Sequence, residues 1–210
     1  SVAPIASLAE TLKNRLQETE LTGVDANNFE DLEVGVETIK RRSEGLLRFA
    51  ETYRNLSRIN SLKQETILIR ELFANLQRLM KPTLDQKNIL FEIVVSDPDL
   101  QLIADPNLID QVLINLLVNA IDAVKEVQQA HIILSAYQDN EGKTVLKLTD
   151  NGTGMSKEVQ EKVFIPFFST KKQGNGIGLS LGKQIVMLHR GSIQLQSAEG
   201  EGTIFTLRFG

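Results

Sequence analysis

The hydrophobic periodicity of the chain changes near residue 60, and this change divides the sequence into two parts. Before it, apolar residues recur at steps of three and four in residues 5–16, which is typical of one face of a helix. After a polar stretch around Gly23, a second run follows a seven-residue repeat. We therefore expect a helical hairpin over residues 1–60, whose repeat positions are Leu32, Val36, Ile39, Ser43, Leu46, Ala50 and Tyr53.

A hairpin of this size buries too little apolar surface to be stable alone. The simplest cover for its apolar stripe is the same stripe of a second copy, which completes a four-helix bundle. The sequence therefore predicts a homodimer formed through this hairpin.

Residues 61–210 mix helix and strand patterns, and the strands mostly follow one another as hairpins. This arrangement predicts an α+β two-layer sandwich, with a mixed, largely antiparallel sheet covered by helices on one face. The expected elements are strands at 65–72 and 88–95 with a helix at 72–81, a long helix that Asp105 caps and Pro106 begins, and two hairpins on either side of a helix that ends near Leu188.

Composition excludes several classes of protein. The net charge of −4 argues against a nucleic-acid-binding surface, which requires an excess of basic residues. Without cysteine the chain has no disulfides, no thiolate metal sites and no cysteine nucleophile. No apolar run approaches the ~20 residues of a membrane span, and no signal-peptide pattern is present. We therefore expect this part of the protein to be soluble.

The long helix carries a pair of asparagines in "NLLVNA". Asn115 and Asn119 are four residues apart, so they share one helix face among aliphatic residues. Their amides either cap neighbouring loops or direct carbonyl oxygens into a pocket. Because Mg²⁺ prefers oxygen ligands, one amide together with phosphate oxygens is enough to hold it.

The stretch "LTDNGTGM" ends a predicted strand with Asp150 and continues into Gly152 and Gly154. An ordinary turn is the simpler interpretation. The alternative is a loop that closes over a flat ligand. An ionised carboxylate only accepts hydrogen bonds, so Asp150 is suited to an exocyclic amine such as that of adenine.

Two further stretches follow. "VFIPFFSTKK" concentrates Phe164, Phe167 and Phe168 around a proline, either as an apolar plug that anchors a loop or as part of a binding site. "TKKQGNGIGLSL" places three glycines directly before a helix and after two lysines. This segment is either a flexible loop or an anion site, in which backbone N–H groups approach phosphates at a helix N-terminus.

Together, and in this order, the four stretches resemble the sensor histidine kinases, most of all those of the nitrogen-regulation type. "NLLVNAIDA" is similar to the family's N box, "DNGTGM" to its G1 box, "FIPFFSTK" to its F box and "GNGIGLSL" to its G2 box. The family shares its ATP-binding fold with gyrase, heat-shock chaperones and mismatch-repair ATPases. The resemblance is strong over residues 61–210 and looser over the hairpin.

The resemblance implies a site for ATP and Mg²⁺ beneath a mobile lid between Phe164 and Gly176. Asn119 would be the Mg²⁺ ligand, Asp150 would bind the adenine amine with Thr203 behind it, and a lysine would contact the distal phosphates. The implied ATP-binding residues are Asn115, Asn119, Asp150, Gly152, Gly154, Phe164, Phe168, Thr170, Lys171, Lys172, Gly174, Gly176, Gly178, Leu179 and Thr203.

Position 115 distinguishes kinases from the related ATPases, which carry a glutamate there to activate water. Asn115 cannot accept that proton, so the resemblance implies transfer to a histidine rather than hydrolysis. Asp122 replaces a basic residue found in many of these kinases, so phosphate contacts from that turn are not expected.

The hairpin resembles the phosphoacceptor element of the family, but its histidine is missing. "SVAPIASLAETL" looks like the end of the acceptor motif, so we expect the histidine a few residues before Ser1 and no catalytic residue in this fragment. His131 opens a predicted strand, and His189 closes a helix, where a cation interacts favourably with the helix dipole; we expect structural or solvated roles for both.

The expected function is the cytoplasmic, ATP-dependent catalytic part of a sensor histidine kinase. Its phosphoryl group would pass to an aspartate of a response regulator, and any membrane contact would come from segments outside this chain. Two alternatives remain open at this point: a degenerate ATP-binding scaffold and an ATPase of the same superfamily.

Overall fold

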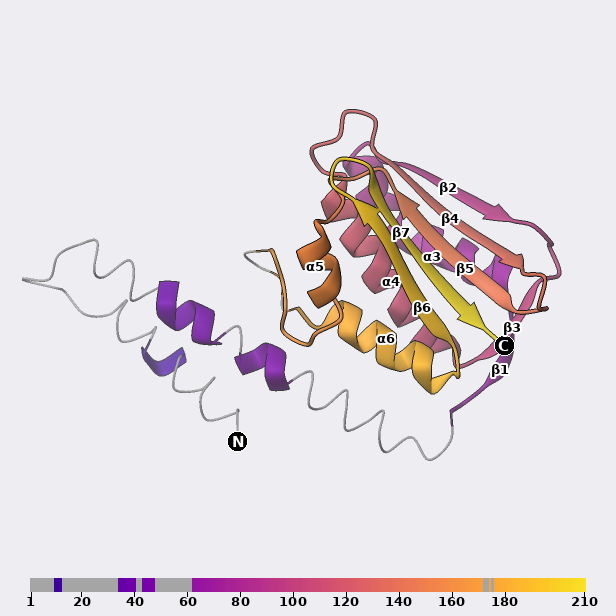
Figure 1. Cartoon of the computed structure of the whole chain (residues 1–210), viewed down its shortest axis with the longest axis horizontal. Coiled ribbons are helices and arrows are strands. Elements are labelled where there is room, and N and C mark those ends of the chain that lie inside the picture. Colours follow the sequence, from indigo (N-terminus) through magenta and orange to yellow (C-terminus); the bar gives the residue numbers. More distant parts are fainter. Residues whose placement is uncertain (1–9, 13–33, 41–42, 48–61, 172–173, 175) are drawn as a thin grey trace, which may run out of the picture. The chain divides into compact units, whose positions relative to one another are not determined.

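The computed structural model of the chain (Figure 1) divides into two compact units. The larger unit contains residues 60–166 and 178–210, and the smaller one contains residues 1–59 and 167–177. The described residues are 10–12, 34–40, 43–47, 62–171, 174 and 176–210.

The larger unit is built on a five-stranded sheet with the order β2-β4-β5-β7-β6. Only β2 and β4 run parallel, while the other neighbouring strands are antiparallel. A second, two-stranded sheet pairs β1 with β3. The strands are β1 (Glu65–Leu68), β2 (Leu90–Val95), β3 (Gln101–Ala104), β4 (His131–Gln138), β5 (Thr144–Asp150), β6 (Ser192–Ala198) and β7 (Gly202–Phe209).

Helices cover one face of the larger sheet, as Figure 1 shows. The helices are α3 (Ile69–Gln86), α4 (Pro106–Ala123), α5 (Lys157–Lys162) and α6 (Gly178–Leu188). Burial along the strands alternates accordingly: Ile132, Leu134 and Ala136 of β4 are fully buried, while the residues between them are only half-buried. The predicted α+β two-layer sandwich is therefore confirmed.

The start of α4 is the one expected from the sequence. A carboxylate oxygen of Asp105 accepts hydrogen bonds from the backbone N–H groups of Asn107 and Leu108, at 3.1 and 3.3 Å. Pro106 occupies the first helical turn, where its missing N–H costs nothing.

The strand predicted at residues 65–72 is wrong beyond Leu68. The structure begins α3 at Ile69, and this helix continues through Pro82 to Gln86. Ile69, Leu72, Phe73 and Leu76 are all buried, which is the spacing of a helix face. The run "TILI" therefore spans the end of β1 and the start of α3. A run of this length does not show where the strand ends and the helix begins. The short elements β3 and α5 were also not expected.

His189 is buried and has a structural role, which is one of the two roles expected from the sequence. Its Nε2 accepts a hydrogen bond from the backbone N–H of Asp105 at 3.0 Å. Its Nδ1 lies 2.8 Å from the carbonyl oxygen of Ile185 and must therefore donate. With one nitrogen accepting and the other donating, His189 joins the end of α6 to the N-cap of α4.

The smaller unit contains helical residues in the segment where the hairpin is predicted. Residues 34–40 and 43–47 are helical, and an ion pair joins Lys40 to Glu10 from the first helical segment. Ile39 is 51% exposed. Leu32, Ala50 and Tyr53 lie outside the described residues, and the homodimer stays a prediction.

Within the part of the chain that the structure describes, no helix combines the length and the apolar character needed to cross a bilayer.

Candidate functional site

Three polar side chains form a row across neighbouring strands of the sheet. Asp150 of β5 is the register partner of Thr203 of β7, and Thr203 is the partner of Ser197 of β6. Partnered residues direct their side chains to the same face of a sheet. Asp150 and Thr203 are only 4% and 2% exposed, so this row faces the helices. We call these three residues the polar row.

The polar row continues an apolar layer of the core. Two residues along each strand, the register places Leu148, Phe205 and Leu195 next to one another. Leu148 and Phe205 are buried, so the apolar layer also faces the helices. The covered face of the sheet therefore changes from apolar to polar at the end where β5 finishes.

Backbone groups of Gly152 and Thr203 form hydrogen bonds with the Asp150 carboxylate. One carboxylate oxygen accepts from the N–H of Gly152 at 2.9 Å, and the backbone of Thr203 provides a second hydrogen bond. Burial raises the pKa of the Asp150 carboxyl to about 6, although both hydrogen bonds act in the opposite direction. At neutral pH Asp150 is mostly an ionised carboxylate in a water-poor environment. It can only accept hydrogen bonds there.

The raised pKa of Asp150 predicts a specific dependence of stability on pH. The unfolded chain releases this proton near pH 3.8 and the folded chain near 6, so stability falls as the pH rises through this interval. We expect this group to lower the free energy of unfolding by about 1–3 kcal/mol between pH 4 and 7. Urea unfolding of the wild type and of Asp150→Asn across this range measures the effect. A constant difference between the two proteins would contradict it.

One face of α4 connects the polar row to the start of α6. Asn115, Asn119 and Ala123 are spaced four apart, so they form a stripe along this helix. At one end, the amide nitrogen of Asn115 donates to the carbonyl oxygen of Gly178 at 3.5 Å. At the other end, the N–H of Thr153 donates to the carbonyl oxygen of Ala123 at 3.1 Å. Asn119 therefore lies between the α6 N-terminus and the loop that follows Asp150.

The asparagine amides of this stripe suit a hard cation. Because the nitrogen of Asn115 is used on Gly178, its oxygen is left as the acceptor. Amide oxygens are among the ligands that Mg²⁺ accepts, and the ion usually keeps several waters as well. Among the described residues, no group of three or more His, Cys, Asp or Glu could hold a metal.

Close contacts with neighbouring backbone explain why the two positions after Asp150, 152 and 154, are glycines. A Cβ on Gly152 would lie 2.7 Å from the backbone of Ala123, and a Cβ on Gly154 would lie 1.8 Å from the carbonyl oxygen of Ala198. Gly154 also has a φ of +66°, which disfavours other residues. These glycines let the loop pack between α4 and the β6–β7 turn. Their role toward a ligand stays a prediction.

Comparison with known proteins agrees with this geometry. A protein family described as histidine kinase-, DNA gyrase B- and HSP90-like ATPases matches residues 104–210, which is more than half of the chain. The chain belongs to this family. The match includes α4, the polar row and the start of α6, and it confirms the ATP-binding family inferred from the four sequence boxes. The nitrogen-regulation type stays a prediction.

The relatives are sensor histidine kinases. ZraS of Salmonella typhimurium is 27% identical over 171 residues, which cover 81% of this chain and 36% of ZraS. AtoS of Escherichia coli is 38% identical over 104 residues, which cover 50% of this chain and 17% of AtoS. The catalytic domain of the histidine kinase ThkA is 32% identical with a TM-score of 0.63, covering 70% of this chain and 95% of that structure. The chain thus spans only a minor part of these curated relatives.

The loop that precedes α6, residues Phe167–Ile177, belongs to the smaller unit. The N–H of Phe167 donates to the carbonyl oxygen of Gly176 at 2.8 Å, which closes the loop. The Ser169 hydroxyl accepts from the N–H of Lys171 at 3.1 Å. Lys172 lies outside the described residues. The roles of Phe168, Thr170, Lys171, Gly174 and Gly176 in this family site stay predictions.

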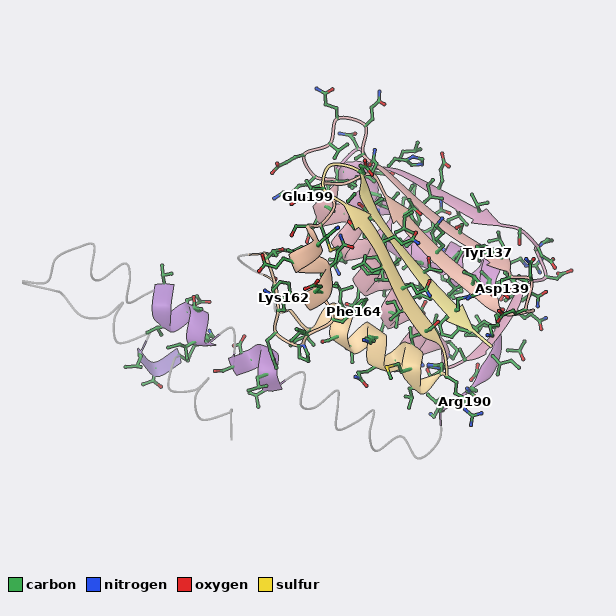
Figure 2. All side chains as sticks on the ribbon, viewed as in Figure 1. Tyr137, Asp139, Lys162, Phe164, Arg190 and Glu199 are labelled. Carbon is green, nitrogen blue, oxygen red and sulfur yellow. The ribbon has the colours of Figure 1, made fainter. Side chains whose placement is uncertain are left out.

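Two other predicted residues lie in the larger unit near α6. Phe164, labelled in Figure 2, follows α5. The ammonium group of Lys183 lies 5.2 Å from the centre of its ring. This cation–π contact joins the start of the loop to α6. Leu179 is half-buried in the first turn of α6. The position of Phe164 agrees with the plug interpretation of "VFIPFFSTKK", and the roles of Phe164 and Leu179 toward ATP stay predictions.

Several residues that shape the site were not identified from the sequence. Asn151 accepts from the N–H of His131 at 2.8 Å and donates to the carbonyl oxygen of Gln129 at 2.7 Å, so it ties the loop to the start of β4. Gln160 of α5 donates to the carbonyl oxygens of Met155 and Ser197. The sequence did carry a signal for Ser197, since strand alternation places it on the same face as the apolar residues of β6.

Proposed function

We propose that this chain binds Mg-ATP and acts as the catalytic domain of an ATP-dependent protein-histidine kinase. The observation that carries the proposal is the α4 stripe, which connects a buried carboxylate at Asp150 with the N-terminus of α6. A nucleotide that lies along this stripe would have its base at the polar row. Its phosphates would then reach Asn119 and the first turn of α6.

Asp150 would recognise the base. Its carboxylate accepts hydrogen bonds only, and the exocyclic amine of adenine donates them. Backbone N–H groups hold the carboxylate from behind, which supports a fixed orientation toward the ligand. Guanine presents an oxo group at the same ring position, so two acceptors would meet. Asp150 therefore favours adenine over guanine.

The phosphates would be bound by backbone and side-chain groups of this chain. The N-terminus of α6 begins at Gly178, and free N–H groups at a helix N-terminus attract anions. Lys171 or Lys172 would add positive charge, while the loop with Phe168, Thr170, Gly174 and Gly176 would close over the nucleotide as a lid. Mg²⁺, when bound by Asn119, would neutralise charge on the phosphates.

Transfer to histidine is favoured over hydrolysis by Asn115, whose amide cannot act as a general base. The acceptor is not His189, because both of its ring nitrogens are engaged in a buried position. His131 is not favoured as the acceptor, because it lies in β4 and its Nε2 is 3.4 Å from a carboxylate oxygen of Glu92. We infer that the acceptor is a histidine other than His131 and His189, the two that this sequence contains, and that the phosphoryl group then passes to an aspartate of a response regulator.

Nucleotide binding tests the proposal directly. At a hundred times its dissociation constant, Mg-ATP is expected to raise the free energy of unfolding by about 2.7 kcal/mol, because it binds only the folded state. Urea unfolding with and without Mg-ATP measures this effect, and Mg-GTP serves as the control for base recognition. Absence of any stabilisation by Mg-ATP would contradict the proposed site.

Phosphoryl transfer separates the kinase from the two alternatives. We expect labelled phosphate to move from ATP to a supplied histidine-bearing hairpin, with little release of free phosphate. Steady hydrolysis that is lost in Asn115→Ala would favour an ATPase. Binding of ATP without transfer or hydrolysis would favour a scaffold that signals by conformation.

A further inference from the structure

The hydroxyl groups of the polar row are connected in a fixed direction. Ser197 Oγ donates to the carbonyl oxygen of Gly202 at 2.8 Å, since a carbonyl can only accept. Ser197 Oγ also lies 3.0 Å from Thr203 Oγ1. Because the single proton of Ser197 is used on Gly202, the hydrogen bond between the two hydroxyls must use the proton of Thr203.

This direction determines what Thr203 can offer to a ligand. Its hydroxyl proton points toward Ser197, so only oxygen lone pairs remain for other partners. Thr203 is 2% exposed, and the neighbouring backbone is paired within the sheet. Next to it, the Asp150 carboxylate also accepts only. The row therefore presents two acceptors side by side and no side-chain donor.

We propose that Ser197 is a positioning residue that holds the Thr203 hydroxyl as an acceptor and thereby sets the preference for a purine that carries an amine at position 6. This inference rests on the proposed nucleotide site and deepens it. An amine at this ring position brings only donors, whereas an oxo group brings only an acceptor. Without Ser197, the Thr203 hydroxyl can rotate and donate, so an oxo group becomes tolerable.

Position and burial distinguish this role from a general contribution to folding. Ser197 is half-buried on the helix-facing side of β6, and its carbonyl oxygen is held separately by Gln160 at 2.9 Å. Removing the Ser197 hydroxyl therefore leaves the backbone of β6 anchored to α5. The affected groups are the Thr203 hydroxyl and the carbonyl oxygen of Gly202.

The test compares the dissociation constants of Mg-ATP and Mg-ITP, whose bases carry an amine and an oxo group at position 6. We expect Ser197→Ala to reduce the ratio of the ITP constant to the ATP constant by about fivefold, which is the effect of one neutral hydrogen bond. Ser197→Thr keeps the hydroxyl and should retain the wild-type ratio. Ser192→Ala, an exposed serine at the other end of β6, is the matched control and should not change the ratio.

A second variant keeps the proposal testable if Ser197→Ala folds poorly. Thr203→Val removes the hydroxyl that Ser197 orients, so it should also reduce the ratio. Adding Ser197→Ala to Thr203→Val should then have no further effect, because the two residues act through one group. Additive effects of the two substitutions on the ratio would overturn the proposal.

The remaining outcomes are also decisive. An unchanged ratio in Ser197→Ala or in Thr203→Val would overturn the proposal, and so would an equal loss of affinity for both nucleotides. If, with such a result, the wild type still binds ATP and Asp150→Asn weakens this binding, only the role of Ser197 fails. If the wild type binds no ATP, the proposed nucleotide site fails and this inference fails with it.

Discussion

Asp150→Asn is expected to weaken the binding of adenine nucleotides about a hundredfold, which corresponds to about 2.7 kcal/mol. The variant side chain can keep its oxygen toward the N–H of Gly152, which lies 2.9 Å from the carboxylate oxygen. Its NH₂ group would then face the ligand. A donor would meet the donor of the adenine amine, and the charge-assisted hydrogen bond would be lost. Isothermal titration with Mg-ATP at pH 7.5 measures the change.

The same substitution should not reduce the stability of the protein without nucleotide. The ionised Asp150 carboxylate is disfavoured by burial, as its raised pKa indicates, so a neutral amide relieves this cost at neutral pH. Asp110→Asn is a matched control, since burial also raises the pKa of Asp110, which lies on α4 outside the stripe. Unchanged ATP affinity in Asp150→Asn would remove Asp150 from base recognition.

Gly202→Ala is expected to lower the free energy of unfolding by about 3 kcal/mol or more, because strain and a backbone collision add to one another. A Cβ at this position would lie 2.0 Å from the carbonyl oxygen of Asp150, and the φ of Gly202 is +93°. The colliding atom is backbone within a paired strand, so it cannot move away cheaply. Urea unfolding measures the loss.

Gly200→Ala is the control for this prediction, since Gly200 lies two residues earlier, in the turn that leads into β7. Gly200 has a φ of +80°, but a Cβ there would meet nothing within 4 Å. Its substitution should cost only the left-handed conformation, about 1 kcal/mol. Equal losses in the two variants would show that the collision with Asp150 is not the cause.

The elements predicted best from the sequence were those with strong local signals. The cap and proline at the start of α4 were found, and so were the hairpins β4–β5 and β6–β7. The beginning of α3 was placed wrongly, because an apolar run suits either a strand or a buried helix turn. The structural role of His189 was predicted but its partner was not, since Asp105 is 84 residues away along the chain.

The sequence by itself determined the family and indicated the residue types on which the proposed site depends: amides on one helix face, a carboxylate at a strand end, and glycines with lysines before a helix. These are properties of residue type and local spacing. Only the tertiary structure decided that Ser197 joins Asp150 and Thr203 in one row and that the hydroxyl protons of Ser197 and Thr203 point in one direction. The physical reason is that strand register and buried hydrogen bonds depend on partners distant in sequence, which no local pattern specifies.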